Sequence, residues 1–242
     1  MVQATGERNV ELGRFHWPEG AESLPGVVLI HDVWGLSEHS RALAADLARD
    51  GFGVLEIDLY RALGDMEIGD PGEQIRSLSD PAVLADLDAG ADWLVSESLC
   101  RGRKVGVMGV CMGGTYSLLA ACLSDRFRAA VPFYGILSYD IGMLRGPDGR
   151  DHGRKPHSPI EVAERLRMPL LASFGCEDEF VPERDIDALE AALARSGMRF
   201  EVDRYEGAGH AFLNRTREGA YRREAAESAW ARIIPFLSTE LA

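Results

Sequence analysis

Residues 109–113, which read Gly-Val-Cys-Met-Gly, have the composition of a catalytic nucleophile and its turn. They follow an apolar run of strand type, residues 105–110, and precede a helix-like run, residues 115–123. A nucleophile at a sharp strand-to-helix turn has strained backbone dihedrals, and its neighbours come so close that glycine is favoured on both sides. The following helix points free N–H groups and its dipole toward Cys111, which favours the thiolate. The pattern predicts a cysteine nucleophile, although a buried cysteine in a tight turn would look the same.

An acid and a histidine follow Cys111 in the order that a triad of this kind needs. Asp178 comes after one strand-like run, and His210 comes after the last one. Functional groups collect beyond the carboxyl ends of parallel strands, so we expect the three side chains to meet. His210 would take the proton from sulfur and return one to the leaving group, while Asp178 would hold the tautomer of the ring. Glu177 and Glu179 remain rivals for the acid.

The loop that follows an early apolar strand, residues 31–35, offers a second set of groups. The backbone N–H of Val33 in this loop, with the N–H of Met112 after the nucleophile, can form an oxyanion hole for a tetrahedral intermediate. Asp32 and Trp34 lie in the same loop. We therefore expect both side chains near Cys111 or its substrate.

Strand-like and helix-like segments alternate along the chain, which predicts an α/β fold with a mostly parallel sheet and helices on both faces. The expected strands are residues 11–17 at an edge, 26–31, 52–60, 105–110, 128–134, 168–175 and 200–205. The expected helices are one capped by Ser37 and ending near Gly51, one opened by Asp80 as N-cap and Pro81, and residues 115–123, 182–196 and 218–237, with Pro235 kinking or ending the last. Residues 136–158 show no period and predict a long loop. The length of 242 residues fits one domain over residues 1–242.

The net charge and the cysteine spacing argue against several classes of protein. A net charge of −13 argues against nucleic acid or an anionic membrane as partner. Residues 1–8 lack an apolar segment of signal-peptide type, and no apolar run reaches membrane-spanning length. The four cysteines, at positions 100, 111, 122 and 176, form no Cys-x-x-Cys pair and no zinc spacing. We expect a cytoplasmic monomer or small homo-oligomer that acts on a small molecule without a metal.

Five motifs together resemble the dienelactone hydrolase family of α/β-hydrolases. They are Leu-Ile-His-Asp-Val-Trp-Gly at 29–35, Asp-Leu-Tyr at 58–60, Gly-Val-Met-Gly-Val-Cys-Met-Gly-Gly at 106–114, Gly-Cys-Glu-Asp-Glu-Phe-Val-Pro at 175–182 and Gly-His-Ala-Phe-Leu-Asn at 209–214. The likeness covers roughly residues 10–238. It implies a domain without a large lid, a Cys-His-Asp triad with Asp178 as the acid, no cofactor, and hydrolysis of lactones or small esters. The family's name substrate, dienelactone, is an anionic enol lactone.

One position departs from the family pattern. The reference member of the family has a glutamate where this chain has Asp32, and that glutamate holds an arginine at rest and deprotonates the cysteine when substrate arrives. Aspartate is shorter by one methylene, which reduces its reach by about 1.5 Å. Asp32 either still activates Cys111, through a backbone shift or a water, or only caps the following helix. Both interpretations stay open at this point.

The resemblance also implies arginines that bind the substrate. Arg76 is a plausible match to the family arginine before the second helix, and Arg215 lies one residue beyond the family spacing after His210. Trp34 and Phe212 could wall the apolar part of a ligand.

Two alternatives compete with a lactone or ester hydrolase. The same triad could serve a thioesterase or an acyl-transfer enzyme. A non-catalytic binding or redox-sensing module would oxidise Cys111 rather than acylate it. A sensor needs neither Asp178 nor His210, which favours the enzyme.

Overall fold

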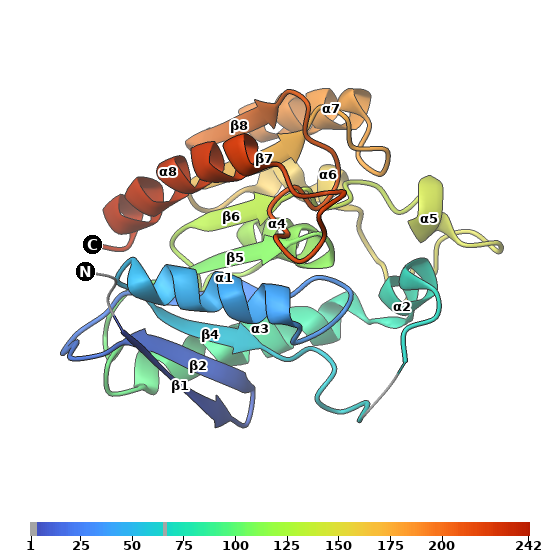
Figure 1. Cartoon of the computed structure of the whole chain (residues 1–242). Helices are drawn as coiled ribbons and strands as arrows, with labels where there is room; N and C mark the ends of the chain where they lie inside the picture. The colour runs from blue at the N-terminus through green and yellow to red at the C-terminus, as the bar shows by residue number, and fades with distance from the viewer. Residues whose placement is uncertain (1–3, 65–66) are drawn as a thin grey trace.

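One sheet of eight strands organises residues 4–64 and 67–242, the part of the chain that this computed structural model describes (Figure 1). The strands are β1 (Thr5–Val10), β2 (Gly13–Pro18), β3 (Gly26–Ile30), β4 (Gly53–Ile57), β5 (Val105–Val110), β6 (Ala130–Phe133), β7 (Leu170–Gly175) and β8 (Phe200–Tyr205). Their order across the sheet is β1-β2-β4-β3-β5-β6-β7-β8. The strands from β4 to β8 pair in parallel, and β1 and β2 add an antiparallel hairpin. The predicted mostly parallel sheet is confirmed.

The central strands are apolar throughout because helices cover both of their faces. Every residue of β3, β4, β5, β6 and β7 is buried. Helices α1 (Glu38–Arg49) and α8 (Arg223–Glu240) pack on one face of the sheet, and helices α3 (Asp80–Ser96), α4 (Met112–Leu123) and α7 (Glu183–Ala194) pack on the other. Each face has its own apolar core. The parallel strands end at one edge of the sheet, so the loops that follow them gather there.

The short helices are α2 (Pro71–Ser77), α5 (Gly142–Arg145), α6 (Pro159–Val162) and the 3₁₀ turn η1 (Ala163–Arg165). Helix α5 lies within the segment 136–158, which was predicted to be a loop, and it contacts α2 (Figure 1). Helices of one or two turns are too short to show a helical period in the sequence. Within the described residues no separate lid domain stands over the strand ends, as predicted.

The N-terminal region differs from its prediction. The single edge strand expected at residues 11–17 is a hairpin in which β1 forms the edge and β2 lies between β1 and β4. The residues of β1 are exposed or half-buried, so no apolar run marks this strand in the sequence. Pairing with β2, rather than burial, holds β1 in place.

Helix ends are partly as predicted. The side chain of Ser37 accepts a hydrogen bond from the N–H of Ser40 and caps α1, as expected. The N-cap of α3 is Ser79 and not Asp80, because the Asp80 side chain pairs with Lys155 instead of the helix.

The closing helix also differs from its prediction. Helix α8 begins at Arg223 rather than residue 218, and it continues through Pro235 to Glu240. Pro235 therefore does not end the helix. Among the described residues, none of the helices combines the length and the apolar character needed to cross a membrane.

Candidate active site

Cys111 lies at a strained turn between β5 and α4. Its φ is 56° and its ψ is −117°, values that a residue with a side chain adopts only at a cost. The approach of the neighbouring backbone explains the glycines. A Cβ on Gly109 would lie 2.0 Å from the carbonyl oxygen of Gly113, and a Cβ on Gly113 would lie 2.2 Å from the carbonyl oxygen of Ile30. The close approach predicted at both glycines is confirmed, and the partly exposed sulfur stands at the first turn of α4.

Asp178 and His210 are joined by a hydrogen bond. The Nδ1–H of His210 donates to Oδ2 of Asp178 over 2.8 Å, and the backbone N–H of Phe180 donates to Oδ1 over 2.9 Å. Asp178 is buried, whereas Glu177 and Glu179 are exposed. The geometry therefore favours Asp178 over both rivals as the partner of His210.

The environment of His210 stabilises its protonated form. Its ring lies between the rings of Tyr134 and Phe180, with centroids 5.1 and 5.0 Å away. Burial by itself opposes the positive charge. The negative Cys111 sulfur and the Asp178 carboxylate outweigh this burial and raise the pKa of His210 to about 10. A negative charge on the neighbouring sulfur therefore favours the imidazolium form of His210.

The two backbone N–H groups that were predicted to form an oxyanion hole are those of Met112 and Val33. Met112 is the first residue of α4, so its N–H has no partner within the helix. Across residues 4–64 and 67–242, neither this N–H nor that of Val33 has a hydrogen-bond acceptor. The hydroxyl of Tyr60 donates to the carbonyl of Val33 over 2.9 Å and contacts the Met112 sulfur at 3.4 Å. Tyr60, which the sequence singled out only as part of the Asp-Leu-Tyr motif, thus ties the two loops together.

Asp32 stabilises the turn after β3. Its Oδ1 accepts the N–H of Trp34 over 2.9 Å. The proposed helix cap is wrong, because Ser37 caps α1. Burial raises the pKa of Asp32, against the opposing effects of the Trp34 N–H and of nearby positive charge that includes Arg217 and His210. Asp32 is thus a buried carboxyl with a raised pKa within the electrostatic reach of His210.

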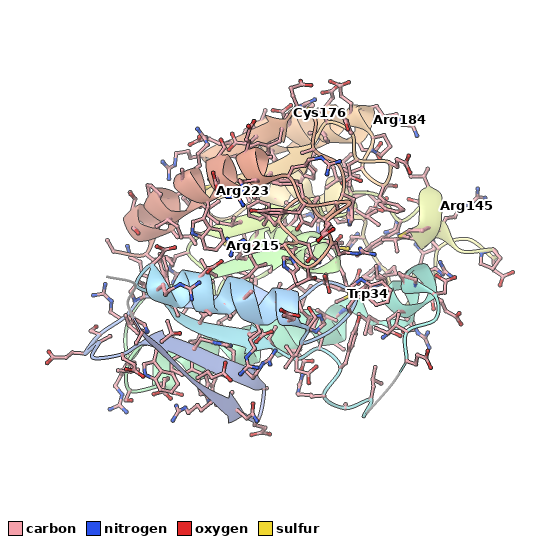
Figure 2. The ribbon with its side chains drawn as sticks, viewed as in Figure 1. Trp34, Arg145, Cys176, Arg184, Arg215 and Arg223 are labelled. Atoms are coloured by element: carbon pink, nitrogen blue, oxygen red, sulfur yellow. The ribbon has the colours of Figure 1, made fainter. Side chains whose placement is uncertain are left out.

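The expected arginines make their contacts elsewhere. Arg76 donates to the carbonyl of Met143 and so links α2 to α5. Arg215 pairs with Asp46 of α1 over 2.9 Å. Figure 2 shows Arg215 above α1, whereas Trp34 lies near the N-terminal end of that helix. These contacts do not support either arginine at the site.

Arg217, rather than Arg215, lies beside Trp34. Its guanidinium carbon lies 5.9 Å from the ring centroid of Trp34. Trp34 itself is 43% exposed, so this pair borders solvent. Arg217 stands seven residues after His210, beyond the family spacing, and only the path of the intervening loop reveals it.

The position of Phe212 contradicts the expectation that its ring lines a ligand site. It has no exposed surface and packs against the rings of Phe133 and Tyr134, with centroids 6.0 and 5.3 Å away. It therefore supports Tyr134 from behind and does not wall a ligand. Tyr134, which sequence reasoning missed, has a φ of 37° and contacts His210 with its ring. Its position directly after β6 is the one signal that could have identified it.

The other thiols differ from Cys111. Burial raises the pKa of Cys100 and of Cys122 to about 12. Partial burial and the neighbouring Glu206 also raise the pKa of Cys176, although its side chain is exposed. Among the described residues, no group of three or more His, Cys, Asp or Glu side chains is arranged to hold a metal ion.

A parallel sheet with a nucleophile turn after β5 and an acid–histidine pair after β7 and β8 defines an α/β-hydrolase. The family model described as "Dienelactone hydrolase family" matches residues 13–241, and this chain belongs to that family. It is accordingly a carboxylic ester hydrolase.

Similar proteins agree with this assignment. A Bradyrhizobium protein named as a probable 2-oxo-3-(5-oxofuran-2-ylidene)propanoate lactonase is 30% identical over 221 residues, which is 90% of this chain and 85% of that protein. A carboxymethylenebutenolidase candidate from Escherichia coli K12 is 28% identical, over 87% of this chain and 75% of its own. The crystal structure of a dienelactone hydrolase candidate from Klebsiella pneumoniae superposes with a TM-score of 0.85 at 27% identity, covering 97% of this chain and 98% of that one.

Proposed function

We propose that Cys111, His210 and Asp178 form a catalytic triad that hydrolyses a lactone or small carboxylic ester through an acyl-enzyme. The observation that carries the proposal is the 2.8 Å hydrogen bond between Asp178 and His210, beside a sulfur at a strained strand-to-helix turn. An acid that orients a base next to a nucleophile is the general form of such triads.

The reaction would proceed in two halves. The Cys111 thiolate attacks the carbonyl carbon, and the N–H groups of Val33 and Met112 stabilise the oxyanion. When the tetrahedral intermediate collapses, the C–O bond breaks and the leaving oxygen takes a proton from His210. Water then attacks the thioester, gives its proton to His210, and releases the carboxylic acid and the free thiolate. In a lactone the leaving oxygen stays attached to the acyl group, so the whole substrate remains bound until water attacks.

Turnover of p-nitrophenyl acetate tests the nucleophile. The parent should release a burst of nitrophenol equal to the enzyme concentration and carry an acetyl group on Cys111 in mass spectra. Cys111→Ala should lower kcat at least about 10⁴-fold and acquire no acetyl group. Cys122→Ala, which removes a buried thiol, is the matched control and should behave like the parent. Parent-like turnover by Cys111→Ala contradicts the proposal, and a redox-sensing module would show neither burst nor adduct.

We further propose that the substrate carries a carboxylate. Arg217 lies over Trp34 at the edge of the site, and a guanidinium binds a carboxylate through two parallel hydrogen bonds. The net charge of −13 repels an anion at long range, so local capture is needed. The Bradyrhizobium relative is named for a lactone of an oxo-propanoate, which agrees with this substrate class.

A lactone with a free carboxylate and its methyl ester form the test pair. Arg217→Gln should raise KM for the carboxylate by roughly 10- to 150-fold, the effect of one charged hydrogen bond, and leave KM for the methyl ester nearly unchanged. Arg215→Gln and Arg76→Gln should have little effect on either compound. Preference for the methyl ester in every variant would show that the substrate is neutral.

A further inference from the structure

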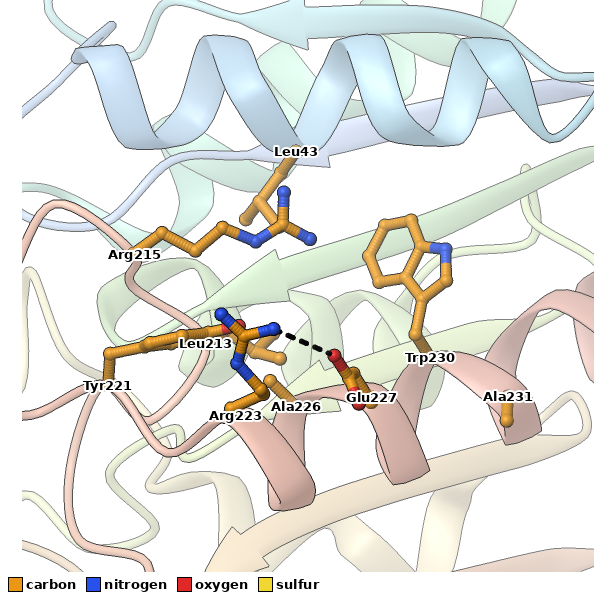
Figure 3. A pocket seen from close by; sticks show the side chains of 9 residues that line it. All are labelled: Leu43, Leu213, Arg215, Tyr221, Arg223, Ala226, Glu227, Trp230 and Ala231. Carbon is orange, nitrogen blue, oxygen red and sulfur yellow. Dashed lines mark ion pairs between the residues drawn. The ribbon is translucent and has the colours of Figure 1, made fainter. Parts of the chain in front are cut away.

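A cavity lies between α1 and α8, on the sheet face opposite α4 (Figure 3). Its volume is about 620 Å³, within the range of small-molecule sites. Leu43 of α1 and Leu213 form part of its wall, with Tyr221, Trp230 and two arginines around them. None of the triad residues lines it. We call it the α1–α8 cavity.

Two guanidinium groups reach the same cavity. Arg215 uses its Nη1 to pair with Asp46, over 2.9 Å. Arg223 has only a long contact, 3.9 Å, with the exposed Glu227 one turn along α8. Figure 3 shows the two arginine side chains on opposite sides of the opening, with Trp230 beside them. Besides these two arginines the described lining residues include one carboxylate, Glu227, and Asp46 already pairs with Arg215, so Arg223 is the guanidinium with the weaker partner.

Arg215 and Arg217 place positive charge near His39, at the start of α1. His39 lies one helical turn before Leu43 and is buried. Burial first, and then the charges of Arg215 and Arg217, lower the pKa of His39 to about 4. An anion could pair with Arg223, whose nearest carboxylate among the described residues is 3.9 Å away, whereas a neutral or cationic ligand could not.

The apolar walls favour a flat ligand. The indole N–H of Trp230 donates to Asp50 over 2.7 Å, which fixes the ring at the cavity wall. Leu43 and Leu213 are almost fully buried and offer only apolar surface. Aromatic rings stack on a fixed indole, and guanidinium groups bind planar carboxylates.

We propose that the α1–α8 cavity binds a small organic carboxylate with a planar apolar body of one or two rings. Arg223 and the free edge of Arg215 bind the carboxylate, and Trp230 stacks on the body. The cavity is separate from Cys111. It is linked to His210 along the chain, because Leu213 and Arg215 follow His210 by three and five residues.

Calorimetric titration with 2-naphthoate tests this site. Cys111 is first alkylated with iodoacetamide, and the adduct is verified by mass spectrometry, so that the active site is blocked. We expect one 2-naphthoate per chain, and binding of neutral 2-naphthamide at least about tenfold weaker because the charged hydrogen bonds are lost. Inorganic phosphate, an anion without a planar body, should also bind at least about tenfold more weakly.

Two variants locate the ligand. Arg223→Gln should raise Kd at least about tenfold. Arg126→Gln, which removes the same charge from an exposed pair with Asp92, should leave it within about twofold. Ala231→Trp, at an exposed position of the wall, should fill the cavity and abolish binding without removing a charge.

Several results would overturn the proposal. They are no binding to the alkylated protein, equal affinity in the Arg223→Gln variant and the parent, and phosphate binding as tight as that of 2-naphthoate. A self-associating parent that Ala231→Trp converts to monomer, with no naphthoate bound, would show that a second copy of the chain fills the cavity instead.

Discussion

Two buried acid–base pairs in this molecule use similar groups and differ in access. In one, the Nζ of Lys155 donates to Asp80 over 2.7 Å and to the hydroxyl of Tyr116 over 2.8 Å. In the other, His210 donates to Asp178 over 2.8 Å. Both pairs lie against aromatic rings.

The surroundings separate a structural pair from a chemical one. Lys155 and Asp80 are each only 2% exposed, and Asp80 sits at the regular start of a helix. The histidine pair borders a partly exposed sulfur on a strained backbone, at the ends of the parallel strands. Burial raises the pKa of Asp80 and lowers that of Lys155, so burial opposes both charges. Access and backbone strain, rather than the kind of side chain, distinguish the proposed active site from the Lys155–Asp80 pair.

The largest expected effect comes from disrupting the pair of His210 and Asp178. His210→Ala should lower kcat by about 10³-fold or more, and Asp178→Asn by somewhat less, because the base is lost or misoriented. Glu179→Gln, a neighbouring exposed carboxylate, is the matched control and should be near neutral. Steady-state kinetics with an activated ester measures all three. A damaging Glu179→Gln with a harmless Asp178→Asn would mean that the acid is misassigned.

Disrupting the pair of Lys155 and Asp80 should lower stability rather than kcat. Lys155→Met leaves Asp80 buried without its cation and should lower the free energy of unfolding by about 3–5 kcal/mol. The double variant Lys155→Met, Asp80→Asn should recover part of that loss, because the uncompensated charge is gone. Urea unfolding measures stability, and kcat at 25 °C should change far less than in the His210 variant. A large loss of kcat with unchanged stability would reverse the roles assigned to the two pairs.

His39 is a buried histidine without an anionic partner among the described residues, and it extends the comparison of the two buried pairs. The folded pKa of His39 is about 4, below the ordinary value of 6.5, so between these values the unfolded chain binds the proton first. Its contribution to stability is present above pH 6.5 and is lost as the pH falls toward 4, up to roughly 3 kcal/mol. His39→Leu should flatten that slope in urea unfolding measured across this range. His152→Gln, at an exposed histidine, should keep the parent slope, and a parent slope in His39→Leu would contradict the assignment.

Asp32 gives the smallest expected effect. If it only holds the turn at Trp34, Asp32→Ala should lower stability by roughly 0.5–2 kcal/mol and leave kcat intact. If it also activates Cys111, alkylation by iodoacetamide in the presence of a substrate analogue should slow as well. Loss of stability without any change in rate would end the activation hypothesis.

Burial decides how much of this fold is visible in the sequence. Strands β3 and β5 are covered on both faces, so they read as continuous apolar runs and were predicted. Strand β1 is polar because it lies at the edge, and it was missed. Helices α2 and α5 were missed because each is only one or two turns long.

The candidate site follows the same logic. Cys111 and His210 could be proposed because each follows a recognisable strand, whereas the choice of Asp178 over its two neighbouring glutamates needed the family resemblance. Phe212 was assigned wrongly because the chain turns at Ala211, whose φ is 62°, and the next side chain enters the core. No local pattern reports such a turn at alanine. For the same reason, the position of Arg217 depends on a loop path that composition does not encode.

The contrast between Cys111 and the other three thiols has a practical consequence. Burial keeps Cys100 and Cys122 protonated at neutral pH, and the acidic surroundings of Cys176 disfavour its thiolate. A limited dose of an electrophilic dye should therefore report one equivalent per functional molecule and serve as an active-site titrant. On the proposed mechanism, oxidation of the Cys111 sulfur by peroxide would stop turnover before it disturbs the fold.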